Sequence, residues 1–141
     1  MSRPNFYNQV YSYAKEYLAE HSKFSPKVLK TSPTESEYFP LVIIQMPEVY
    51  LEDETLKMNG EQMYSFVLNV EIFSMAKVVD NTKYSKASVA QEILQWIYKV
   101  FEEHFVMLGR LPETIQNIDT NVERISIRFT GKFKNNTFYR R

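Results

Sequence analysis

Few side chains in this sequence have the chemistry of an active site or a metal site. His21 and His104 are the two histidines, and each falls near the end of a segment with helical periodicity. Two imidazoles without further ligands at a suitable spacing do not make a metal site. A histidine near the carboxyl end of a helix ordinarily interacts with the terminal carbonyls. We therefore interpret both histidines as structural residues and expect no metal.

The acidic run Glu52-Asp53-Glu54 is the second candidate, because carboxylates bind divalent cations. It lacks the alternating oxygen ligands and the central glycine of a calcium loop. We interpret it as a solvated arm of a hairpin, with a salt-sensitive contact to a basic neighbour as the functional alternative. Asn59-Gly60 lies in the same segment, and both residue types accept the positive φ of a two-residue turn. Residues 49–63 therefore predict an acidic hairpin that projects beyond the core.

Basic residues gather near the carboxyl end of the chain. Arg124, Arg128 and Lys132 are four residues apart in a segment with a period of two, so they share one face of the predicted strand. The tail, residues 132–141, mixes basic and aromatic side chains, a combination that can contact the phosphates of a nucleic acid. A frayed polar tail is one alternative, and a tail that docks on a neighbouring subunit is another.

No constellation of catalytic residues is visible. Cysteine is absent, which excludes a disulfide framework, a thiolate metal site and a cysteine nucleophile. Gly60, Gly109 and Gly131 are too far apart for a phosphate-binding loop, and no nucleophile-elbow pattern occurs. We expect the protein not to be an enzyme and to have no cofactor.

Composition places the chain among folded single domains. It has 141 residues, of which 44% are hydrophobic and 15% aromatic, enough for a core within one domain spanning residues 1–141. Seventeen basic residues balance seventeen acidic ones. A neutral total gives no general attraction to nucleic acid or anionic lipid, and it allows copies to pack against one another. No stretch approaches the roughly 20 apolar residues of a membrane span, and no signal-peptide core opens the sequence. We expect a soluble, unexported protein without membrane contact.

Hydrophobic periodicity predicts two helices, residues 4–21 and about 85–105, with Ser85 or Ser88 as the N-cap of the second. A strand is expected over residues 38–46, ended by Pro47, and its continuous apolar residues 41–44 indicate a central strand covered on both faces. Further strands are expected at 64–73, about 113–118 and 124–133. Residues 25–37 and 77–86 are interpreted as polar connections, and Gly109 and Pro112 as the end of the segment after the second helix.

The predicted element order is α-β-β-β-α-β-β. This order indicates an α+β fold, with a mostly antiparallel sheet, two helices packed on one face and the projecting acidic hairpin.

In these features the chain resembles the tail terminator proteins, also called tail-completion or minor capsid proteins, of long-tailed phages and prophages of Gram-positive bacteria. The likeness is one of pattern and order over most of the chain. It rests on the opening helix, the strand Tyr38-Phe-Pro-Leu-Val-Ile-Ile44, the acidic hairpin, the strand Tyr64-Ser-Phe-Val-Leu-Asn-Val-Glu-Ile-Phe-Ser74, the loop lysines Lys83 and Lys86, Ala90-Gln-Glu-Ile-Leu94, and Arg124-Ile-Ser-Ile-Arg-Phe-Thr-Gly131.

The resemblance implies a structural subunit that is assembled in the cytoplasm of a bacterial host. Six copies would form a closed ring at the head-proximal end of the virion tail, stop polymerisation of the tail tube protein and offer a surface to the neck. DNA in the lumen would make only passive contact. On this hypothesis we expect Glu52, Asp53, Glu54 and Asn59 to contact the neighbouring subunit. Arg124, Arg128 and Lys132 are expected to face the lumen or a partner.

Two alternatives remain at the level of sequence. The chain could be another head-tail connector, such as a stopper or head-completion protein, which would bind the portal side and not the tube end. It could also be a small RNA-binding α+β domain, since its last strand is basic and aromatic. The neutral net charge argues against RNA binding as the main role.

Overall fold

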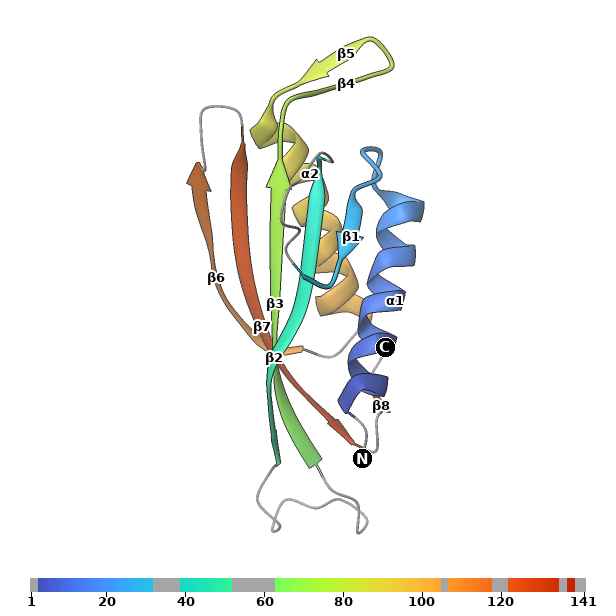
Figure 1. Ribbon diagram of the computed structural model, residues 1–141, viewed down its shortest axis with the longest axis vertical. Coiled ribbons are helices and arrows are strands. Elements are labelled where there is room, and N and C mark those ends of the chain that lie inside the picture. Colours follow the sequence, from blue (N-terminus) through green and yellow to red (C-terminus); the bar gives the residue numbers. More distant parts are fainter. Residues whose placement is uncertain are drawn as a thin grey trace.

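The computed structural model describes residues 3–31, 39–51, 63–104, 107–117, 122–134 and 137–138, and it describes side chains in 7–31, 39–47, 65–102 and 122–131. Figure 1 shows the elements, whose bounds in chain order are α1 Arg3–His21, β1 Lys27–Leu29, β2 Leu41–Leu51, β3 Met63–Ser74, β4 Lys77–Val79, β5 Thr82–Tyr84, α2 Lys86–Tyr98, the π-helix η2 Lys99–His104, β6 Met107–Asn117, β7 Glu123–Lys134 and β8 Thr137–Phe138.

The fold is α+β and is built around one six-stranded sheet. Its strand order is β1-β2-β3-β7-β6, and the short β8 pairs with β7. All of these pairs are antiparallel except β1 with β2. The predicted fold class, with its mostly antiparallel sheet, is therefore confirmed. The strands β2 and β3 pair as far as Leu51 opposite Tyr64, and the predicted acidic hairpin tip between them lies outside the described residues.

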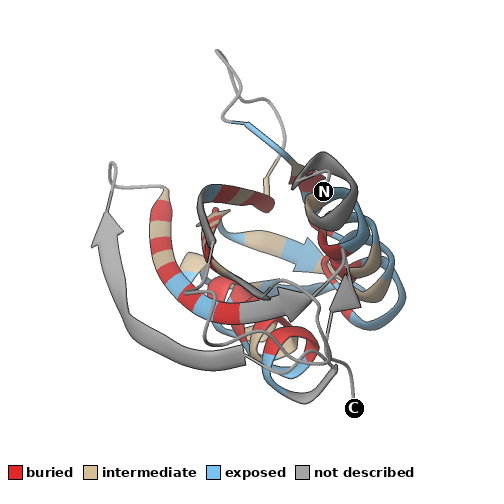
Figure 2. Ribbon diagram, turned by 90° about the horizontal axis from the view of Figure 1, so that it is seen from below, coloured by how far each residue is buried: buried red, intermediate tan, exposed pale blue. Residues whose placement is uncertain are grey.

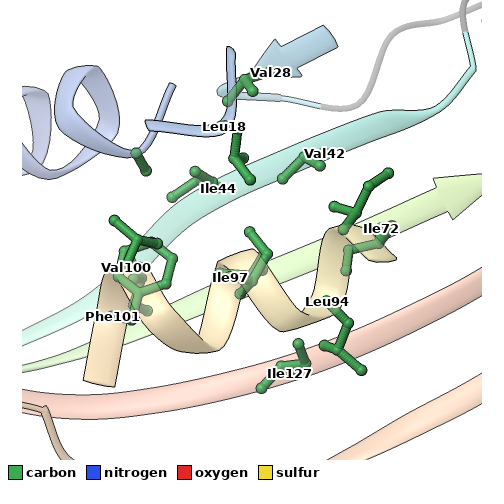
Figure 3. Packing of buried hydrophobic residues seen from close by; sticks show 14 of the residues in the cluster. Leu18, Val28, Val42, Ile44, Ile72, Leu94, Ile97, Val100, Phe101 and Ile127 are labelled. Atoms are coloured by element: carbon green, nitrogen blue, oxygen red, sulfur yellow. The ribbon is translucent and has the colours of Figure 1, made fainter. Parts of the chain in front are cut away.

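Both helices pack on the same face of the sheet. Val10, Ala14 and Leu18 of α1 belong to one hydrophobic cluster with the buried residues of α2. Figure 3 shows how Leu94, Ile97 and other side chains of this cluster meet residues from β1, β2, β3 and β7. The sheet residues of the cluster alternate along each strand, as a period of two requires; they are Val42, Ile44 and Met46 of β2, Phe66, Leu68, Val70 and Ile72 of β3, and Ile125, Ile127 and Phe129 of β7.

Strand β2 extends further than the sequence predicts. The prediction that Pro47 ends the strand is wrong, because β2 continues to Leu51. The pairing with β3 shifts register between Gln45 and Glu48. This irregularity accommodates Pro47, since a proline has no N–H for the ladder and is tolerated at a bulge. The four apolar residues 41–44 are all at most 3% exposed, which confirms that both faces of this part of β2 are covered.

The same correction applies to β6. Gly109 and Pro112 do not end the structure after the helix; both lie within β6, which begins at Met107 and is longer than the predicted strand. The pairing with β7 shifts register between Met107 and Gly109 and again between Leu111 and Thr114. Glycine and proline are tolerated within an edge strand at such irregularities.

Four short strands were not predicted. Residues 27–29 form β1 within the expected polar connection, and β8 pairs with the end of β7 where a frayed tail was one alternative. The expected loop 77–86 contains β4 and β5, an antiparallel hairpin separate from the main sheet. Its turn residues Asp80 and Asn81 have φ of 50° and 65°. Two successive positive φ values are the mark of a type I′ turn, which matches the twist of a hairpin.

Helix α2 begins as predicted and ends differently. The side chain of Ser85 accepts a hydrogen bond from the backbone N–H of Ser88, so Ser85 is the N-cap. The last turns, from Lys99 to His104, form a π-helix. Val100 and Phe101 in this segment are both fully buried, so the predicted apolar face is maintained through the change in helix type.

Candidate contact surfaces

The face of the sheet opposite the helices, here called the outer face, carries the first candidate surface. Figure 2 shows burial alternating along the strands, and on β7 the buried residues Ile125, Ile127 and Phe129 alternate with Ser126 and others that are more exposed. By register the outer face contains Gln45 of β2, Ser65, Asn69, Glu71 and Phe73 of β3, and Arg124, Ser126, Arg128 and Thr130 of β7. The sequence placed the two arginines on one face of the last strand, and the structure has them there.

Arg124 is held by an ion pair. Its Nε donates to Glu71 Oε2 at 2.6 Å, and a second guanidinium nitrogen is in contact with the same oxygen. The Arg124 carbon Cζ also lies 5.9 Å from the ring centre of Phe73. The side chain of Arg124 is 35% exposed and that of Glu71 is 17% exposed. Because a carboxylate already neutralises it, Arg124 adds little net positive charge to the outer face.

Arg128 has a different environment. It is exposed, and its Nε donates to the side-chain oxygen of Asn69 at 3.0 Å. Asn69 is the residue directly opposite on β3. A neutral amide orients the guanidinium without cancelling its charge. Of the two arginines, Arg128 is therefore the one better placed to attract an anion or an acidic partner.

The structure tests only part of the predicted contact set. Lys132 pairs with Ser65 through the backbone of β7 and β3, which places it in the same alternation as Arg124 and Arg128, but its side chain lies outside the described part. Glu52, Asp53, Glu54 and Asn59 lie outside the described residues altogether, so their role in inter-subunit contact stays a prediction.

The hairpin formed by β4 and β5, here called the arm, is the second candidate surface. Figure 1 shows it beyond the end of the main sheet at which β3 finishes. Its base is tied to the turn after α1. The ring of Tyr84 meets that of Phe24 edge-on at 5.1 Å, and Lys77 Nζ donates to the Phe24 carbonyl at 3.4 Å. Lys23 Nζ lies 4.5 Å from the centre of the Tyr84 ring. An isolated two-stranded hairpin is only marginally stable in water, so these contacts explain how the arm is held.

The two sides of the arm differ in exposure. Lys77, Val79 and Tyr84 are half-buried, and the latter two pack against the core. Val78 and Lys83 are paired across the hairpin, and both are exposed. Val78 is 62% exposed, and it is the one large hydrophobic residue that is exposed among the described residues. The outward side of the arm thus presents an apolar side chain next to a cation.

Where the end of α1 meets α2, the carboxylate of Glu92 accepts several hydrogen bonds, and aromatic rings pack beside it. One carboxylate oxygen of Glu92 accepts from Ser22 Oγ at 2.8 Å. The other accepts from the Lys23 backbone N–H at 3.1 Å and from Trp96 Nε1 at 3.0 Å. His21 stacks on Trp96 with ring centres 5.1 Å apart. These contacts join the end of α1 to α2, which agrees with a structural role for His21. The side chain of His104 lies outside what the structure describes.

Two tyrosines fasten α1 to the sheet. Tyr7 donates its hydroxyl hydrogen to the Ile44 carbonyl at 2.5 Å, and Tyr11 donates to the Val28 carbonyl at 2.8 Å. Burial raises the pKa of Tyr7 to about 12, with a smaller contribution from the neighbouring Tyr11, and burial also raises the pKa of Tyr11. Lys30 Nζ lies 5.0 Å from the Tyr11 ring centre. Both phenols act as neutral donors, so their role is to position the helix.

Within the described residues, no group of three or more histidine, cysteine or acidic side chains could hold a metal ion. No helix in that same part of the chain is long and apolar enough to cross a bilayer.

The arm is the surface that sequence patterns did not predict. The signal was present in Asp80-Asn81, since both residue types tolerate a left-handed conformation and they stand between Val78-Val79 and Thr82. Three-residue strands are too short for a period of two to be distinguished from a loop.

No family model matches the sequence, and no curated protein is similar to it at a significant level. Among solved structures, a chain from the virion of a native gene transfer agent particle is similar over 86% of this chain and 92% of that chain, with 11% sequence identity and a TM-score of 0.47. A likeness of this strength does not by itself identify a shared role.

Proposed function

We propose that this protein is a structural subunit of a phage or phage-like tail that associates with copies of itself into a closed ring. In this role it caps the head-proximal end of the tail tube, stops the tube protein from polymerising and joins the tube to the neck. The proposal starts from the resemblance to tail terminators carried by the sequence. The structural observation that most supports it is the arm, which is anchored at Tyr84 and exposed at Val78 and Lys83.

A ring subunit needs a rigid body and a surface that meets a different surface on the next copy. The two helices on one sheet form the rigid body. A contact between two different patches closes into a ring when the rotation between neighbours is a whole fraction of a turn. The arm and the predicted acidic contact residues are two such different patches. The arm follows β3 after Ser74, whereas the acidic segment precedes Met63 at the other end of the same strand.

The outer face fits a passive surface better than a nucleic-acid site. Tight binding of RNA requires several uncompensated cations and accessible aromatic rings. On the outer face Glu71 neutralises Arg124, and Phe73 is half-buried next to that pair. Arg128 is bonded to a neutral amide. This pattern favours a lumen or partner surface over the RNA-binding alternative.

The experiment is assembly with and without tube ends. The purified protein is examined by light scattering and negative-stain microscopy, alone and after addition of the tube protein from the same genome. The proposal expects closed rings, alone or on tube ends, and shorter tubes as the protein is added. A strict monomer that leaves tube length unchanged would refute it. Binding to the portal side instead of the tube end would identify the stopper alternative.

A further inference from the structure

We propose that Tyr7 and Tyr11, in addition to fastening α1, block the open edge of the sheet against the addition of a strand from a second copy. Strand β1 is an end strand of the described sheet, and it covers β2 only over Leu41–Ile43. The open edge of an end strand presents backbone groups that can pair with another chain. This inference does not depend on the proposed ring, because strand addition is a different kind of self-association.

The register shows which backbone groups lie along this open edge. The N–H of Lys27 donates to the Pro40 carbonyl at 3.1 Å, so the backbone groups of Lys27 face β2. Because successive residues of a strand turn their N–H and C=O groups to alternate sides, those of Val28 face away from β2. By the same alternation, Ile44 faces the β1 side of β2, as Pro40 does. Strand β1 ends opposite Ile43. The Val28 and Ile44 carbonyls are therefore acceptors that an added strand would use.

Each of these two carbonyls accepts a hydrogen bond from a tyrosine hydroxyl. Tyr11 donates to the Val28 carbonyl at 2.8 Å, and Tyr7 donates to the Ile44 carbonyl at 2.5 Å. The two tyrosines are four residues apart, so they lie on one side of α1, which runs beside β1 (Figure 1). Burial raises the pKa of both phenols, that of Tyr7 to about 12, so both remain protonated donors. An incoming strand would have to displace each hydroxyl and its ring before it could pair at that position.

A lysine directly after β1 adds a charge to the same edge. Lys30 is exposed, and its Nζ donates to the side-chain oxygen of Asn8 at 2.6 Å. The same Nζ lies 5.4 Å from the ring centre of Tyr7 and 5.0 Å from that of Tyr11. A cation over an aromatic ring is attracted to it, so Lys30 helps to hold both rings in place. Lysine at a sheet edge also disfavours the approach of another strand. Two hydroxyls and one charge thus block this edge.

The test removes the two hydroxyls and retains the rings. In the double variant Tyr7→Phe/Tyr11→Phe, both edge carbonyls become acceptors for an added strand. Each new hydrogen bond strengthens docking, so the association constant between copies should rise by roughly tenfold or more. Light scattering measures association, and thioflavin T fluorescence with a fibre-diffraction spacing of about 4.7 Å identifies pairing between strands. The matched control is Tyr13→Phe/Tyr17→Phe, which makes the same two changes on the side of α1 where Tyr17 contacts Trp96.

A second control separates an opened edge from a general loss of stability. Glu92→Ala removes hydrogen bonds between α1 and α2 and leaves the contacts of Tyr7 and Tyr11 in place. All variants are compared at a temperature at which circular dichroism shows each of them to be folded. Strand-paired association of the Tyr7→Phe/Tyr11→Phe variant, with neither control associating, supports the inference. Association of this variant at the wild-type level, or equal association by either control, overturns it.

The single variant Tyr11→Phe provides the comparison if the double variant does not fold, because it retains the hydrogen bond from Tyr7 to Ile44. It should show the same change in smaller degree, and association at the wild-type level overturns the inference here as well. Ring formation by the wild type is a separate measurement. A failure of the proposed function therefore leaves this test and its outcome unaffected.

Discussion

Removal of the Glu92 side chain should destabilise the fold by about 2–3 kcal/mol. Glu92→Ala removes three hydrogen bonds, which reach the Glu92 carboxylate from Ser22, Lys23 and Trp96. A net contribution of about 1 kcal/mol per bond is appropriate because the residue is half-buried and the donors can partly turn to water. Alanine is a good helix former, which offsets a few tenths of a kcal/mol at most.

The variant Glu92→Gln separates the contribution of the hydrogen bonds at position 92 from that of the negative charge. The glutamine oxygen can accept from both Lys23 N–H and Trp96 Nε1, while its amide group donates to Ser22 Oγ, because a hydroxyl also accepts. All three contacts are retained and only the charge is lost. We therefore expect a loss of less than about 1 kcal/mol, the margin by which hydrogen bonds to charged groups exceed neutral ones.

Urea or thermal unfolding followed by circular dichroism measures these differences. A loss of 2–3 kcal/mol should lower Tm by about 5–10 °C for a domain of this size. Gln91→Ala, at an exposed neighbouring position of α2, is the control and should change Tm little. If Glu92→Ala costs less than about 1 kcal/mol, or if Glu92→Gln costs as much as Glu92→Ala, the hydrogen-bond network is not what joins α1 to α2.

Three further predictions concern other parts of the fold. Tyr7→Phe should cost about 1 kcal/mol at neutral pH, because it removes the bond to the Ile44 carbonyl. The raised pKa of Tyr7 means that the folded state holds the neutral phenol. Its stabilisation is complete below pH 10, the ordinary pKa, and is lost as the pH rises towards about 12. Alkaline unfolding of the variant should show a smaller loss, and an identical pH profile would contradict this. A double-mutant cycle on Arg124 and Glu71 should give about 1 kcal/mol or less that declines in high salt, since the pair is partly exposed. Asn81→Gly should raise Tm slightly and Asn81→Ala should lower it, because φ is 65° at this position; the reverse order would exclude the observed turn.

The long helices and strands of this fold can be predicted from the sequence because each contains a long hydrophobic pattern. The period of two in β7 and the spacings of three and four in α1 and α2 determine which residues face the core. The arginine pair on the outer face follows from the same alternation. Periodicity could not show which residue each arginine side chain contacts. Glu71 and Asn69 come from β3, and only the register of β3 with β7 brings them opposite the last strand.

The errors concern proline, glycine and short strands. Pro47 was expected to end a strand and Pro112 to end the segment after the second helix, yet each lies within a strand, near a shift of register. A sequence does not indicate whether a neighbouring strand can bulge to accept a missing N–H, because that depends on pairing between distant segments. Strand β1 and the arm were missed because each strand has three residues. Their stability comes from contacts such as Tyr84 with Phe24, which are sixty residues apart in the chain.

The irregularities of the sheet also bear on how copies can associate. An exposed regular edge strand would add a strand from any other copy and continue into a fibre. At one edge of this sheet β6 contains Pro112 and two shifts of register. At the other edge the three-residue β1 pairs only with Leu41–Ile43 of β2, and the rest of β2 contains Pro47 and a shift of register. Neither edge offers a long regular ladder, so extension of the sheet between copies is disfavoured. In the proposed ring, association would then use side chains and projecting elements, whose geometry fixes the rotation between neighbours. A fixed rotation closes after a set number of copies, whereas strand addition has no natural end.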